Sequence, residues 1–147
     1  MRKHLALLAV ISMLLIPVIV YAAGSAITFT EVTHGSVKKV KVAWTSDNVT
    51  GGVSGTTTNA YSGRFLGAIT VPGTAGDQPD DNYDITIADS DGVDLALGAL
   101  ANRDEATTEF VAEASMGGVA SSPLTFTISN ASGVGVNTKG TIYLLIR

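Results

Sequence analysis

The stretch from Asn82 to Leu97 constrains the fold most, because it carries the period-two alternation of a β-hairpin. Its large apolar residues fall at every second position of two short runs: Tyr83, Ile85, Ile87, Val93, Leu95 and Leu97. Successive side chains of a strand point to opposite faces, so this spacing predicts two half-buried strands. A hairpin of this kind needs a second apolar layer to cover its buried face.

The turn of this hairpin decides its register. A two-residue loop at Asp91-Gly92 would divide the large apolar residues between two faces, whereas a three-residue loop at 90–92 places them on one, as a buried face requires. An aspartate that opens a type I turn and a glycine at the bulge also favour the longer loop. We therefore expect a left-handed Gly92 and three cross-strand pairs: Asp89 with Val93, Ile87 with Leu95, and Ile85 with Leu97.

Other segments alternate in the same way. Val37–Thr45 is the clearest, because Val40, Val42 and Trp44 share one face and lysines occupy the other. Further strands are expected at 26–33, 63–71, 124–128 and 141–147, with a short strand at 56–59 inside a long polar loop, 46–62. Residues 103–114 form either a short helix or a loop leading into a strand, and the strand-rich surroundings favour the strand.

These segments together define the fold class. The last strand, Thr141–Arg147, is apolar on both faces, which predicts a central strand or a subunit contact. Seven or eight short strands separated by Gly-, Pro- and Asp-rich turns predict an all-β fold. We expect a single antiparallel β-sandwich or jelly roll over residues 23–147.

Residues 1–22 have the features of a secretory signal peptide. Their start is basic, residues 5–20 are apolar, and Ala22 ends a small-residue cleavage pattern. The alternative is an uncleaved hydrophobic anchor helix, because Leu5–Ala23 is just long enough to span a bilayer. Cleavage would place the protein in the periplasm or outside the cell. The chain has no cysteine, so its domain depends on apolar burial, oligomerisation or a bound ion rather than on disulfides.

The charge distribution narrows the classes of partner. The net charge is −4, and nearly all carboxylates of the domain lie between Asp77 and Glu113. An acidic domain argues against nonspecific nucleic-acid binding, which needs cations to displace counterions. Positive charge is concentrated at Lys38, Lys39 and Lys41. Three lysines in one strand are typical of a solvated face or a protected edge, with a binding patch as the less common alternative.

No catalytic pattern stands out in the sequence. His34 is the only histidine after residue 22, it lies in an expected turn, and no Gly-x-Ser-x-Gly elbow is present. We therefore assign no catalytic residue and no organic cofactor, and expect a non-enzyme. Asp89, Asp91 and Asp94 are weak calcium candidates. Their run lacks the glycine position and the closing glutamate of an EF-hand loop, and turn chemistry accounts for every residue in it.

Turn and strand motifs follow one another in a recognisable order between Thr50 and Arg147. In chain order they are Ser62-Gly63, Val71-Pro72-Gly73, residues 81–87, Asp91-Gly92-Val93-Asp94, residues 101–104, 123–126 and 129–131, and residues 140–147. Their order resembles that of small proteins of tailed bacteriophages and prophages. Members of this group are regarded as virion structural or hypothetical proteins, with head decoration as one role. The resemblance implies a virion location and brings no catalytic residues, whereas the leader at 1–22 departs from it.

These observations favour a non-enzymatic structural β-domain that associates with itself or decorates a larger assembly. The expected partners are copies of the same chain or other virion proteins, and a membrane is contacted only if residues 1–22 stay uncleaved. The alternative function is a secreted or cell-surface binding module. Such a module would present the polar loops 46–62 and 74–81 to a glycan or to another protein.

Overall fold

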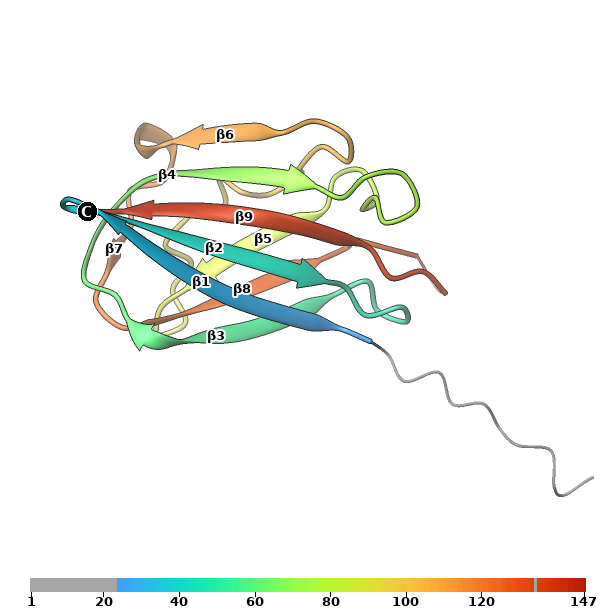
Figure 1. Ribbon diagram of the computed structural model, residues 1–147, viewed down its shortest axis with the longest axis horizontal. Coiled ribbons are helices and arrows are strands. Elements are labelled where there is room, and N and C mark those ends of the chain that lie inside the picture. The colour runs from blue at the N-terminus through green and yellow to red at the C-terminus, as the bar shows by residue number, and fades with distance from the viewer. Residues whose placement is uncertain (1–23, 134) are drawn as a thin grey trace, which may run out of the picture.

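The computed structural model describes residues 24–133 and 135–147, which form a sandwich of two antiparallel β-sheets (Figure 1). The leader expected at 1–22 lies outside the described residues. The elements of the described chain are β1 (Ala26–His34), β2 (Val37–Thr45), β3 (Val53–Ala60), β4 (Gly63–Pro72), β5 (Asp84–Ala88), β6 (Glu109–Ala112), the 3₁₀ turn η1 (Glu113–Ser115), β7 (Val119–Ala120), β8 (Pro123–Ser129) and β9 (Lys139–Ile146).

The two layers differ in size. The large sheet has six strands, in the order β1-β2-β9-β4-β6 with β7 paired to the start of β4, and the small sheet has three, in the order β3-β8-β5. In Figure 1 the large sheet lies in front of the small one. The expected all-β antiparallel sandwich is therefore confirmed. The described residues include no helix that is long and apolar enough to cross a bilayer.

Every second side chain of the central strands points into the space between the two sheets and is buried there. The core-facing residues of β2, β8 and β9 are at most 3 % exposed: Val40, Val42, Trp44, Leu124, Phe126, Ile128, Ile142, Leu144 and Ile146. Trp44 of β2 packs against Tyr83, which lies just before β5 of the small sheet, with 5.7 Å between the two ring centroids. Gly140 pairs with Trp44, and a Cβ at this glycine would lie 2.5 Å from the indole. The burial of each Val, Leu, Ile or Phe side chain in this core contributes roughly 1.5–3 kcal/mol to the stability of the fold.

β9 is the central strand of the large sheet. It pairs with β2 on one side and with β4 on the other. This position explains the apolar character of both its faces, one inside the sandwich and one outside. The prediction of a central strand at the end of the chain is confirmed.

The predicted hairpin is confirmed at its turn. Gly92 is left-handed, with φ of 81°, and its N–H donates to the carbonyl of Asp89 at 3.1 Å. The Asp89 N–H donates to the Val93 carbonyl at 3.2 Å, and the Leu95 N–H donates to that of Ile87 at 2.8 Å. These bonds match the three-residue loop and the first two expected pairs.

The hairpin prediction is wrong beyond Leu95, because Asp94 organises a second turn. The Asp94 carboxylate accepts three backbone N–H bonds of 2.9–3.1 Å, from Ile87, Ala96 and Gly98. Such side-chain bonds compete with the ladder of a return strand. Leu97 is consequently turned outward and is 66 % exposed. Leu100 is buried instead, and its carbonyl accepts the Ile85 N–H that was expected to face Leu97.

Two ambiguous stretches are resolved. Nearly half of the expected polar loop 46–62 belongs to β3, which is longer than the predicted strand at 56–59. Hydroxyl pairs hold it to β8, with Ser54 Oγ 2.9 Å from Thr127 Oγ1 and Thr56 Oγ1 2.9 Å from Thr125 Oγ1. Residues 103–114 form a loop, β6 and η1, so the strand interpretation is confirmed there.

A β-bulge in β4 changes which residues face the core. The pairing with β9 shifts between Phe65 and Gly67. Phe65 is therefore buried on the same side as Ala68, while Ile69 and Val71 point away from the small sheet. The uniform alternation predicted for 63–71 does not hold through this bulge.

Gly92→Val tests the turn. A Cβ at Gly92 would meet nothing within 4 Å, so the cost comes only from the positive φ. We expect a loss of about 1–2 kcal/mol in the free energy of unfolding, measured by urea denaturation at one fixed protein concentration. Gly133→Val is the control, since that glycine also has open space and no left-handed φ. Equal losses for the two variants would contradict this explanation.

Candidate functional site

The large sheet presents one face to the outside, which we call the outer face: the side chains that point away from the small sheet. Paired residues of neighbouring strands lie side by side on it, since cross-strand partners share a face. Three consecutive rows run across the strands: Val32, Lys39, Leu145, Gly67 and Ala112; Thr30, Lys41, Tyr143, Ile69 and Phe110; and Thr28, Ala43, Thr141 and Val71.

The centre of the outer face is apolar. Phe110 is 63 % exposed, and Ile69, Tyr143 and Leu145 are half-buried. The ring of Phe110 lies over Gly67, where a Cβ would come within 2.8 Å of it. The solvent-facing side of an antiparallel sandwich is ordinarily polar, and a contiguous apolar patch there marks an interaction surface.

Lysines flank this apolar centre along β2. Lys39 Nζ lies 4.4 Å from the centroid of the Tyr143 ring, and Lys41 is exposed directly opposite Tyr143. Lys38 points to the other side of the strand, with its Nζ 5.6 Å from the Tyr61 ring centroid. None of the three lysines forms an ion pair within the described residues. β2 is an internal strand, so the interpretation of these lysines as protection for a sheet edge is wrong.

Small side chains leave the outer face concave near the start of β1. A depression of about 330 Å³ opens there, and its lining includes Ala26, Ala43, Gly73 and Gly140. Lys139 borders it and is paired with Asp77 at 3.0 Å. Its charge is therefore matched, unlike the charges of Lys39 and Lys41. The depression offers shape rather than catalytic groups.

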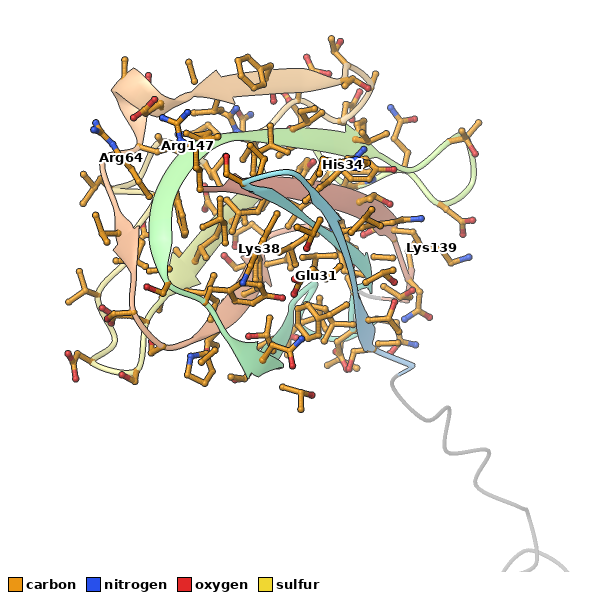
Figure 2. The ribbon with its side chains drawn as sticks, turned by 60° about the vertical axis from the view of Figure 1, so that its left-hand side comes forward. Glu31, His34, Lys38, Arg64, Lys139 and Arg147 are labelled. Atoms are coloured by element: carbon orange, nitrogen blue, oxygen red, sulfur yellow. The ribbon has the colours of Figure 1, made fainter. Side chains whose placement is uncertain are left out.

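A second feature is a groove of about 160 Å³ between β1 and β3. Its lining combines aromatic and polar side chains: Phe29, Glu31, Thr57, Thr58, Asn59 and Tyr61. Tyr61 is 3 % exposed, and burial raises its pKa to about 12, with the nearby Glu31 carboxylate adding to the shift. Glu31 and Lys38, which are labelled in Figure 2, lie near one another, and both are close to Tyr61 in the structure. Nothing in the sequence pattern predicts this groove, because it depends on how β1 meets β3.

The calcium candidates serve the turns of the chain. The Asp89 carboxylate accepts the N–H groups of Asp91 and Val93, both at 3.0 Å, and Asp94 holds the second turn described above. Asp91 itself is exposed. Within residues 24–133 and 135–147, no three Asp, Glu or His side chains gather into a group that could hold a metal ion.

Other ionisable side chains also make contacts that support the fold. Arg103 Nη1 lies 3.4 Å from Glu109 Oε2. Beside this pair, burial raises the pKa of Tyr83 to about 12, and the charge of Glu109 adds to the shift. His34 is exposed at the β1–β2 turn, where Figure 2 labels it. The outer face, in contrast, exposes apolar side chains beside lysines that form no ion pair within the described residues.

Comparison with protein-family models, with curated proteins and with solved structures gives no significant match. The outer face was only partly foreseen in the sequence. The two-sided apolarity of Tyr143 and Leu145 pointed to it, whereas the sequence pattern alone does not show which way Ile69 and Val71 point, because the bulge in β4 sets their direction. Phe110 was hidden in the segment whose secondary structure was ambiguous.

The two shifted tyrosines give a pH test. A phenol whose pKa is raised on folding stabilises the fold below about pH 10, and this stabilisation is lost as the pH rises through about 12. Absorbance titration at alkaline pH should show a component near pH 12 that decreases in Tyr61→Phe and in Tyr83→Phe. Ionisation of both phenols near pH 10 in the folded protein would contradict the burial described here.

Proposed function

We propose that this chain is a non-enzymatic structural β-domain that associates through its outer face with copies of itself or with other structural proteins. The observation that carries the proposal is the apolar centre of the outer face. Phe110, Ile69 and Leu145 lie where a sandwich normally presents polar side chains to water. Covering them removes apolar surface from water, which favours association.

The size of the outer face suits a modest, repeated contact. β9 has eight residues, and five strands cross the face. At about 3.4 Å per residue and about 4.8 Å between strands, the face covers roughly 500 Å². A partner that covers this face would bury about 500 Å² on each side and about 1,000 Å² in total, the lower limit for a specific interface. Contacts of this size suit an assembly that repeats one weak interface many times.

A virion is the assembly we propose for this domain, on the strength of its resemblance to small phage structural proteins. Head decoration is the role that suits a single cysteine-free sandwich with an apolar outer face. Mass spectrometry of purified particles from the source tests this version directly. Detection at a fixed ratio to the capsid protein is the expected result, and absence from the particles would exclude a virion role.

Phe110→Ser tests the outer face. Because Phe110 is largely exposed, its loss leaves the core intact but removes apolar contact area. We expect sedimentation of the full chain to show self-association about tenfold or more weaker than in the wild type. Val49→Ser is the matched control, since Val49 is also 63 % exposed but belongs to the loop after β2. Equal effects of the two substitutions, or a wild-type chain that stays monomeric, would count against the proposal.

A ligand-binding module is the second candidate function, favoured by one observation. A depression of about 430 Å³ adjoins the loop 74–81, and Thr74, Ala75 and Gln78 contribute to its lining. Its size falls within the range of small-ligand pockets. A glycan array probed with and without calcium would test this candidate. Reproducible binding that is lost on Gln78→Ala would support it, and no binding in either condition would count against it.

A further inference from the structure

We propose that self-association is head-to-tail: the acidic turn of one copy, residues 89–98, docks on the outer face of the next. The inference rests on the proposed function and names the partner surface that the outer face receives. It is drawn from two surfaces of the same chain whose apolar groups and charges are complementary. No further molecule is needed to satisfy either surface.

The acidic turn exposes large apolar side chains. Leu97 is 66 % exposed and Val93 is 53 % exposed. Leu97 also has a left-handed backbone, with φ of 54°, which is unfavourable for a residue with a Cβ. Residues held in such sparsely populated backbone conformations cluster at active sites and ligand-binding sites. Leu97 is thus suited to enter the apolar centre of a neighbouring outer face.

The acidic turn is also preorganised. The Asp89 and Asp94 carboxylates accept five backbone N–H bonds between them, of 2.9–3.1 Å. These bonds fix the turn before any partner arrives, so little conformational entropy is lost on docking. The rigid turn carries its apolar and acidic groups as one unit.

The charges of the two surfaces are opposite, and neither set is matched among the described residues. Asp89, Asp91 and Asp94 form no ion pair within the described residues, and neither do Lys39 and Lys41. The lysines lie beside the apolar centre of the outer face, as the aspartates lie beside Val93 and Leu97. Docking would therefore bring opposite charges together around an apolar contact, which steers association and fixes its orientation.

The positions of the two surfaces require a head-to-tail arrangement. The acidic turn follows β5 of the small sheet, whereas the outer face belongs to the large sheet and points away from the small one. The surfaces are different patches, so their contact is heterologous and generates a ring or an open chain rather than a closed two-fold dimer.

The proposal is tested by sedimentation of two variants of the full chain in which selected side chains are replaced by uncharged polar ones. The face variant carries Lys39→Gln and Lys41→Gln, and the turn variant carries Asp91→Asn and Leu97→Asn. Asparagine tolerates the left-handed φ at position 97, and the aspartates that hold the turn are kept. We expect each variant alone to associate about tenfold or more weakly than the wild type, and high salt to weaken the wild type.

Mixing the variants distinguishes the possible arrangements. A head-to-tail contact predicts that the mixture forms 1:1 pairs and nothing larger, because one intact turn meets one intact face. If the turn variant associates like the wild type while Phe110→Ser does not, self-association through the outer face stands and the head-to-tail inference is overturned. A wild-type chain that is monomeric at every concentration overturns both.

Discussion

The pairing of β9 with β2 on one side and β4 on the other is the constraint on which the rest of the structure depends. Its register places Ile142, Leu144 and Ile146 against the small sheet, where they are fully buried. Because side chains alternate, the same register places Tyr143 and Leu145 outside, beside residues of β2 and β4. One set of backbone hydrogen bonds therefore builds both the core and the outer face. A change that slips β9 by one residue would exchange the two.

The absence of cysteine gives this core its importance. Without disulfides, a domain of this size is held by apolar burial and by satisfied polar groups. At one end of the sandwich, Ser46 Oγ lies 3.0 Å from Thr138 Oγ1 and accepts the Thr138 N–H at 2.9 Å, which ties the end of β2 to the start of β9. β9 and β4 contribute buried side chains to the core and also present Tyr143, Leu145 and Ile69 on the outer face. Stability and the proposed contact function thus share one scaffold.

The sequence was sufficient to predict which side chains are buried wherever a strand alternates regularly. It was insufficient wherever a side chain or a bulge redirects the backbone. Val40, Val42 and Trp44 could be placed in the core because period-two alternation admits no other face. Leu97 was misplaced because Asp94 has several possible hydrogen-bond partners, and only the fold shows that it takes backbone N–H groups of its own turn. The direction of Ile69 could not be predicted, because an extra residue in β4 is invisible in the pattern. The strand predicted at 56–59 is shorter than β3, because edge strands rich in Thr and Gly carry little alternation.

The central claim is that the outer face of one copy meets the acidic turn of another. Carbodiimide cross-linking of a mixture of unlabelled and ¹⁵N-labelled chains, followed by mass spectrometry, tests it most directly. The reagent joins carboxylates to amines in direct contact, and mixed labels identify links between different copies. We expect mixed-label links between Asp91 and Lys39 or Lys41. Mixed-label links that join other surfaces and never these residues, or the absence of mixed-label links altogether, would contradict the claim.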